Sequence, residues 1–158
     1  MIVVITGTPG TGKTSLARFI ARNLGFKRID VAPLIKSISC GYDLKRGCEI
    51  VDSDKFVKAL LLLIKGKKQK LVIDSHLAHC LPSDIVGLCI VTKCDLLVLK
   101  KRLDKRYKGN PEKVRENLDA EIFDICHNEA VEFGHKVEIV DTTKGLKLQN
   151  IKKIISSK

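Results

Sequence analysis

The fold is decided by one stretch near the start of the chain, Met1-Ile-Val-Val-Ile-Thr-Gly7-Thr-Pro-Gly10-Thr-Gly12-Lys13-Thr14. Its second half matches G-x-x-x-x-G-K-[ST], the phosphate-binding P-loop. Glycines let successive backbone N–H groups turn inward around phosphate oxygens, and the helix that follows directs its positive end at the same anion. Lys13 can reach the β- and γ-phosphates of a nucleoside triphosphate, and the Thr14 hydroxyl can hold Mg²⁺.

The residues on both sides of the motif support this interpretation. Ile2–Ile5 is apolar and β-branched, as expected of a buried parallel strand. Thr14–Leu24 carries apolar residues at helical spacing and stops before Gly25. The alternative is a glycine loop that joins a strand to a helix and binds nothing, which the motif and its context together disfavour.

Length and composition indicate a single domain. The 158 residues suffice for one full core, and no run approaches the roughly 18 apolar residues of a membrane span. Met1 is followed directly by the strand, so we expect no signal or transit peptide. The six cysteines form no C-x-x-C pair, and we interpret them as reduced thiols of a cytoplasmic protein. A zinc site of His76, His79 and Cys80 is disfavoured, because no second ligand pair follows.

The net charge of +11 has two interpretations. It favours binding to polyanions such as RNA, and it is equally typical of the lysine-rich surface of a heat-stable protein. Trp is absent and aromatic residues are few, so platforms for stacking single-stranded bases are poorly supplied.

Short apolar runs alternate with helical patterns along the rest of the chain. We expect strands at Phe26–Val31, Leu71–Asp74, Gly87–Thr92 and Lys136–Val140, and a turn at Cys40–Asp43. We expect helices at Leu34–Ile38, from Asp52 or Ser53 to Ile64, and at Asp95–Lys108, Glu112–Phe133 and Leu146–Ile155. This alternation predicts a three-layer α/β fold with a central parallel sheet.

Asp74 closes the apolar run that begins at Leu71, which is the Walker B pattern. Its carboxylate would emerge at the carboxyl end of the strand, beside the P-loop, and could hold Mg²⁺ directly or through water. His76 follows two residues later, where it could contact phosphate or water. A lone histidine is more often structural.

Arg102 and Arg106 are four residues apart and share a helix face. Two guanidinium groups on one face suit polyphosphate, although a solvated basic helix end would look the same. Thr92-Lys-Cys-Asp95 matches a guanine-specificity motif by letters, but the matching Asp-x-x-Gly does not follow the Asp74 strand, so a GTPase switch is disfavoured. A small kinase fits better, with an acceptor-binding insertion at about 30–65 and a mobile lid at about 102–112.

The combination of motifs resembles the adenylate kinase 6 family. It rests on Gly7–Thr14, Asp74-x-His76, Arg102-Leu-x-x-Arg106 and Glu116-Asn-x-x-Ala-Glu121-Ile-Phe123. The resemblance implies a P-loop nucleoside-monophosphate-kinase-like fold and Mg²⁺-dependent phosphoryl transfer from ATP to AMP, giving two ADP, with a slow ATPase. It also implies a role in ribosome biogenesis, through a small-subunit ribosomal protein and pre-rRNA. We expect a monomer, cytoplasmic or, in a eukaryote, nuclear.

The resemblance also implies roles for individual residues. Catalysis would fall to Lys13, Asp74, His76 and Arg106, and the metal to Thr14 and Asp74. The nucleotide would be bound by Gly10, Gly12, Lys13, Thr14, Ser15, Arg102, Arg106 and Lys144. Two departures concern the acceptor side and the lid: Lys36 stands where the family usually has arginine, and Gly109 is displaced from its usual place after Arg106. The alternative function is therefore a nucleotide-gated ribosome assembly ATPase with little AMP kinase activity.

Overall fold

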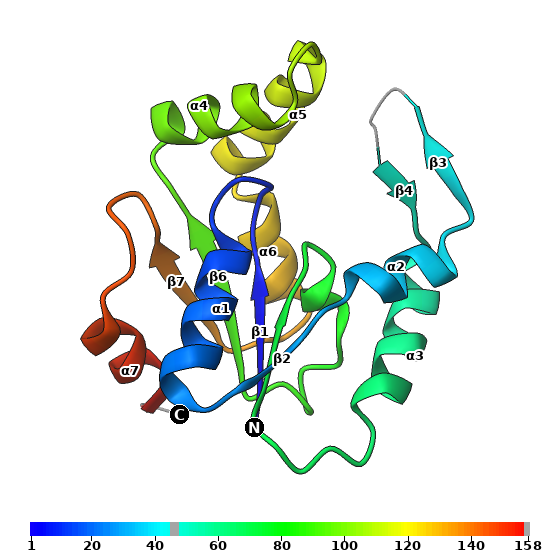
Figure 1. Cartoon of the computed structure of the whole chain (residues 1–158), viewed down its shortest axis with the longest axis vertical. Helices are drawn as coiled ribbons and strands as arrows, with labels where there is room; N and C mark the ends of the chain where they lie inside the picture. Colours follow the sequence, from blue (N-terminus) through cyan, green and yellow to red (C-terminus); the bar gives the residue numbers. More distant parts are fainter. Residues whose placement is uncertain (45–47, 157–158) are drawn as a thin grey trace.

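A computed structural model of the chain describes residues 1–44 and 48–156. Five parallel strands form its main sheet in the order β2-β5-β1-β6-β7. They are β1 (Ile2–Thr6), β2 (Lys27–Ile29), β5 (Leu71–Asp74), β6 (Leu88–Lys93) and β7 (Val137–Asp141). Helices cover both faces of this sheet (Figure 1). The predicted three-layer α/β fold is confirmed, and each predicted strand is present with small shifts at its ends.

The alternation of side chains along β1 divides the core into two layers. Val3 and Ile5 pack with Leu16 and Ile20 of α1 (Lys13–Leu24) and with α7 (Leu148–Ser156). Gly25 ends α1 in the left-handed conformation, with φ +70°, as the sequence predicts.

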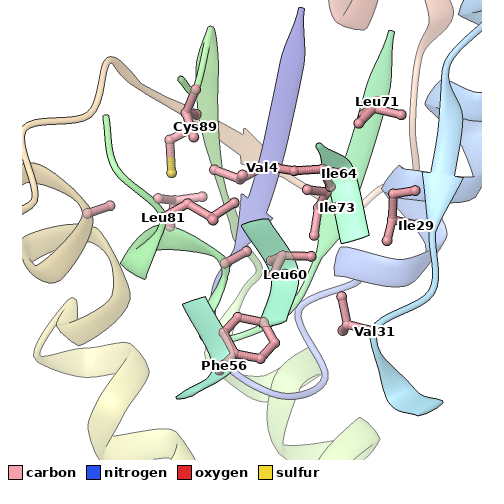
Figure 2. Packing of buried hydrophobic residues seen from close by; sticks show 14 residues of the cluster. Val4, Ile29, Val31, Phe56, Leu60, Ile64, Leu71, Ile73, Leu81 and Cys89 are labelled. Atoms are coloured by element: carbon pink, nitrogen blue, oxygen red, sulfur yellow. The ribbon is translucent and has the colours of Figure 1, made fainter. Parts of the chain in front are cut away.

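The second layer covers the opposite face of the sheet. Val4 and Ile73 pack with Phe56 and Leu60 of α3 (Ser53–Ile64), and Figure 2 shows these side chains meeting between helix and sheet. Phe56 and Leu60 are fully buried, which stabilises the fold by about 1.5–3 kcal/mol for each side chain. Asp52 caps α3 by accepting from the Lys55 N–H at 2.8 Å.

The segment between β2 and β5 contains a hairpin that the sequence does not reveal. After α2 (Ala32–Ile38), β3 (Gly41–Asp43) pairs antiparallel with β4 (Cys48–Ile50). The predicted turn at Cys40–Asp43 is therefore wrong. Strands of three residues are too short to show alternation, and only the pairing between them defines the hairpin.

The segment after β6 is helical, as predicted. It comprises α4 (Leu96–Arg106), α5 (Pro111–Ile122) and α6 (Ile125–Glu132), while a single 3₁₀ turn (Ala78–Cys80) follows β5. The Asp95 carboxylate accepts from the Leu97 and Val98 N–H groups and so caps α4. Asp95 therefore has a structural role as a helix cap, which explains its presence in Thr92-Lys-Cys-Asp95 without guanine binding.

The helix predicted over Glu112–Phe133 is wrong, because it breaks at Asp124. Asp124 has φ +55°, its carboxylate pairs with Lys93, and Phe123 O accepts from Asn128 Nδ2 at 3.1 Å. The break also turns Ile122 and Ile125 outward, where they are 56% and 41% exposed.

Two further expectations concern membranes and thiols. None of the described helices combines the length and apolarity needed to cross a bilayer. The cysteines whose side chains are described are free thiols, namely Cys40, Cys80, Cys89, Cys94 and Cys126. The side chain of Cys48 lies outside the described part of the chain.

Candidate nucleotide-binding and phosphoryl-transfer site

Gly7 and Gly12 of the P-loop occupy positions where a side chain would be strained. Gly7 has φ +136°, and a Cβ there would lie 2.6 Å from the carbonyl oxygen of Thr92. Gly12 has φ +92°, and a Cβ there would lie 3.1 Å from Thr142 Oγ1. Thr11 Oγ1 donates to Thr8 O at 2.7 Å and thereby fixes the middle of the loop. The loop is therefore held rigidly against neighbouring segments.

Lys13 lies at the start of α1 and folds over the loop. Its Nζ donates to the carbonyl oxygens of Gly7 at 2.6 Å and Thr8 at 3.0 Å. Burial lowers the pKa of Lys13 to about 8, and the nearby Arg106 charge contributes in the same direction. An ammonium group that has lost this much hydration gains strongly from a nearby anion, which suits a phosphate ligand.

Asp74 joins three elements at the carboxyl edge of the sheet. Its Oδ2 accepts from Thr14 Oγ1 at 2.7 Å, so the two halves of the predicted metal site meet. Arg28, from β2, donates to the same carboxylate through Nε at 2.6 Å and Nη2 at 3.2 Å. The Asp74 side chain is 4% exposed, so this two-point ion pair is largely shielded from water. No motif or spacing in the sequence predicts a role for Arg28.

A cleft of about 400 Å³ opens above these residues. It brings together Lys13, Thr14, Asp74, His76 and Arg106, which are the predicted catalytic and metal-binding residues. Its remaining lining comes from Pro9, Gly10, Gly12, Ser15, Arg28, Asp30, Val31, Ala32, Ile35 and Ser75. The cleft thus runs from the P-loop and Arg106 of α4 to the start of α2. Figure 1 shows where α2 and α4 lie relative to the P-loop.

His76 lies in this cleft two residues beyond Asp74, as the sequence predicts. Desolvation by the cleft walls, followed by the Lys13 charge, lowers the pKa of His76, although the residue as a whole remains exposed. At neutral pH this favours the neutral imidazole, which can both accept and donate a hydrogen bond.

Arg102 and Arg106 line different hollows although they share a helix. Arg106 reaches the cleft with Lys13, whereas Arg102 borders a second hollow of about 370 Å³ with Gly10, Gly12, Ser15, Thr142, Gly145 and Leu146. Arg102 Nη1 donates to Gly10 O at 3.1 Å, and Nη2 donates to Thr142 O at 3.4 Å. Lys144 lines neither hollow and borders a third along β7 and α7.

Glu121 braces the P-loop from outside. Its Oε2 accepts from Thr8 Oγ1 at 2.6 Å, and its Oε1 accepts from the Cys94 N–H at 3.4 Å. The carboxylate therefore ties α5 to the loop and to the end of β6. The motif around Glu121 carried the family resemblance, but the sequence assigned this residue no role.

Thr14 and Asp74 fit a magnesium ion. Mg²⁺ prefers hard oxygen ligands and is usually held by one or two carboxylates together with substrate phosphates and water. The hydroxyl and carboxylate oxygens lie 2.7 Å apart on the cleft wall, within the space that a polyphosphate would enter.

His79, the next histidine after His76, lies outside the cleft. His79 is buried, with Nδ1 3.1 Å from Thr6 Oγ1 and Nε2 3.2 Å from Glu129 Oε2. Burial lowers the pKa of His79 to about 4. Across residues 1–44 and 48–156, no three His, Cys, Asp or Glu side chains are grouped to hold a metal by themselves.

A family match and a solved structure of similar fold indicate the class of protein to which the chain belongs. The family described as an AAA domain matches residues 3–124. The deoxyadenosine kinase of M. mycoides, solved with bound dATP, superimposes with a TM-score of 0.58 at 15% identity, over 99% of this chain and 98% of that one. At this identity the likeness shows the fold alone, and together with the family match and the P-loop geometry it defines a P-loop protein of α/β fold.

Curated relatives give the family. The adenylate kinase isoenzyme 6 homolog of Dictyostelium discoideum is 38% identical over 141 residues, which is 87% of this chain and 78% of that protein. The adenylate kinase isoenzyme 6 homolog FAP7 of Saccharomyces cerevisiae is 32% identical over 160 residues, covering 98% and 80% respectively. The chain belongs to the adenylate kinase isoenzyme 6 family.

Proposed function

We propose that the chain is an adenylate kinase that transfers the γ-phosphoryl group of ATP to AMP, giving two ADP, with a slower ATPase reaction beside it. One observation supports this most strongly. The cleft of about 400 Å³ is lined at one end by the P-loop and at the other by Asp30–Ala32 and Ile35, so that donor phosphates and an acceptor share one space.

The donor is assigned to the two hollows on either side of the P-loop. We assign its phosphates to Gly10, Gly12, Lys13, Thr14 and Ser15, because Lys13 and the loop offer N–H donors together. We assign the base and ribose to the second hollow, where Arg102 borders the other side of the glycines. Lys144 is adjacent to Gly145 in that hollow, and we place it at the rim of the adenine loop.

The transfer itself needs little chemistry from the protein. A phosphate oxygen of AMP attacks the γ-phosphorus, and the bond to the β–γ bridging oxygen breaks, leaving ADP on both sides. The AMP oxygen is already ionised, so no strong general base is required. Lys13 and Arg106 stabilise the charge on the moving group. Thr14 and Asp74 would hold Mg²⁺, which would supply further neutralisation of the phosphate oxygens.

The ATPase reaction uses the same cleft with water as the acceptor. Asp74 and His76 are two residues apart on the cleft wall, and neutral His76 can orient a water molecule. We assign the acceptor insertion to about 30–65 and the lid to about 102–112, whose closure would exclude water during transfer.

Initial rates with and without AMP test the proposal. ADP formation from ATP and Mg²⁺ should rise at least tenfold when AMP is added, because binding of the acceptor replaces slow hydrolysis by oriented transfer. A rate that does not depend on AMP would overturn the proposed kinase reaction.

A second candidate is a nucleotide-gated ribosome assembly ATPase that binds a small-subunit ribosomal protein or pre-rRNA. The observation that favours it is Lys36, which is exposed and does not line the cleft, so the usual acceptor-binding arginine has no counterpart there. A pull-down from ribosome-containing lysate with and without ATP tests it. Absence of a ribosomal protein in both conditions would count against it.

A further inference from the structure

Arg28 is a charged residue of the cleft to which no role has been given. It belongs to β2 and lies opposite Val72 of β5 in the sheet, so its side chain approaches the end of β5 from the neighbouring strand. Its guanidinium grips both oxygens of Asp74, at 2.6 Å and 3.2 Å, and lies 4.0 Å from Asp30 Oδ1. Its side chain is 23% exposed, so it is neither a surface charge nor fully enclosed.

The Asp74 carboxylate already accepts three hydrogen bonds, so a metal that binds it must share its oxygens with Arg28 and Thr14. Both of its oxygens accept from Arg28, and Oδ2 accepts from Thr14 as well. A divalent cation at the same carboxylate competes with the guanidinium for oxygen lone pairs and repels its charge at short range. Binding of Mg²⁺ therefore weakens the hold of Asp74 on Arg28.

A released Arg28 has a second place to bind within the same cleft. The cleft is lined beyond it by Val31, Ala32 and Ile35, which belong to the acceptor side. A guanidinium offers planar two-point binding to a phosphate, which lysine does not. Lys36 is exposed and does not line the cleft, whereas Arg28 does.

We propose that Arg28 releases Asp74 when a divalent cation binds the Asp74 carboxylate, and that the freed guanidinium then binds the phosphate of the acceptor nucleotide. This inference rests on the proposed kinase function. Arg28 thereby makes acceptor binding depend on the metal–donor complex, and it supplies the guanidinium that α2 lacks. Asp74 keeps the same side chain from binding phosphate before the metal is present.

Two binding measurements on the full chain test the exchange. The variants are Arg28→Gln and Arg28→Lys, and Lys27→Gln is the matched control, because Lys27 is the exposed cation next along β2. Arg28→Gln leaves the buried Asp74 carboxylate without its cation. If that variant does not fold, Arg28→Lys serves instead, because it keeps a positive charge beside Asp74. Mn²⁺ binding to the protein–ADP complex is followed by electron paramagnetic resonance. AMP binding to the protein with Mg²⁺ and a non-hydrolysable ATP analogue is followed by calorimetry.

Arg28→Gln should bind Mn²⁺ roughly 3- to 10-fold more tightly than the native chain. Arg28→Lys should lie between the two, because its charge still opposes the metal. Both variants should bind AMP at least roughly tenfold more weakly, with Lys27→Gln unchanged. Mn²⁺ affinity that is unchanged or weaker in both variants would overturn the competition at Asp74. Unchanged AMP affinity, with the native chain binding AMP, would overturn the acceptor contact. If the native chain binds no AMP, the proposed function and the acceptor contact fail together, and the Mn²⁺ measurement still decides the competition.

Discussion

The Thr14 hydroxyl donates to Asp74 Oδ2 at 2.7 Å, which joins the first turn of α1 to the end of β5 across 60 residues of sequence. Parallel pairing places Ile5 opposite Asp74, so the P-loop and the acidic strand end emerge at the same edge of the sheet. Two motifs that are separate in the sequence therefore form one oxygen pair in the cleft.

Removal of the Thr14 hydroxyl should weaken the metal-dependent reaction. We expect Thr14→Val to lower kcat/KM roughly 10- to 100-fold, because the metal loses a ligand and Asp74 loses a hydrogen bond. Steady-state rates over a range of Mg²⁺ concentrations measure this. Thr14→Ser keeps the hydroxyl and should retain most of the activity; equal losses in both variants would contradict a role for the oxygen.

The lowered pKa of Lys13 predicts proton uptake on nucleotide binding. With a pKa of about 8, Lys13 is mostly neutral at pH 8.5, and phosphate oxygens raise that pKa in the complex. Binding should then take up roughly 0.7 proton at pH 8.5, and affinity should fall as pH rises above 8. Calorimetry in buffers of different ionisation enthalpy measures the uptake.

Lys13→Met is the control for this measurement. It removes the titrating group, so its uptake should approach zero, and both transfer and ATPase activity should be lost. Proton uptake that persists in Lys13→Met would assign the titration to another group.

Arg102 should act on the donor alone. It borders the hollow assigned to the base and ribose, while Arg106 borders the transfer cleft. We expect Arg102→Ala to raise KM for ATP roughly tenfold and to leave KM for AMP unchanged. The control is Lys101→Ala, since Lys101 is the exposed neighbour on α4. Equal effects on both substrates would show that the two hollows do not serve separate ligands.

Two glycines provide a matched test of the P-loop's packing. Gly7→Ala places a Cβ 2.6 Å from Thr92 O in addition to its positive φ, whereas Gly25→Ala meets nothing within 4 Å. We expect Gly7→Ala to lower the free energy of unfolding by roughly 2–5 kcal/mol and Gly25→Ala by about 1 kcal/mol. Urea denaturation compares them, and equal losses would mean that the close approach to Thr92 is relieved easily.

The parts that the sequence predicts well are those determined locally. The strand, glycine loop and helix from Ile2 to Leu24 follow from residue types and spacing, and Asp52 and Asp95 stand at helix starts as predicted. The convergence of Lys13 with Asp74 could also be anticipated, because parallel strands end at one edge of a sheet.

The parts that it misses depend on distant partners. The Asp124 break is held by Lys93, 31 residues away, and the hairpin exists through pairing between two three-residue strands. Arg28 lies 46 residues from Asp74 in the sequence. Together with the adjacent Lys27 it resembles a pair of basic residues exposed to solvent. A periodicity or a local motif contains no information about such contacts.

The proposed reaction passes a phosphoryl group from ATP to AMP within one cleft. The most direct measurement incubates the chain with Mg²⁺, unlabelled ATP and AMP labelled in its adenine ring, and separates the products by chromatography. Labelled AMP should become labelled ADP. One labelled ADP should appear for each unlabelled ADP that forms in excess of the amount formed without AMP. Labelled AMP that is recovered unchanged while ATP is hydrolysed would contradict it.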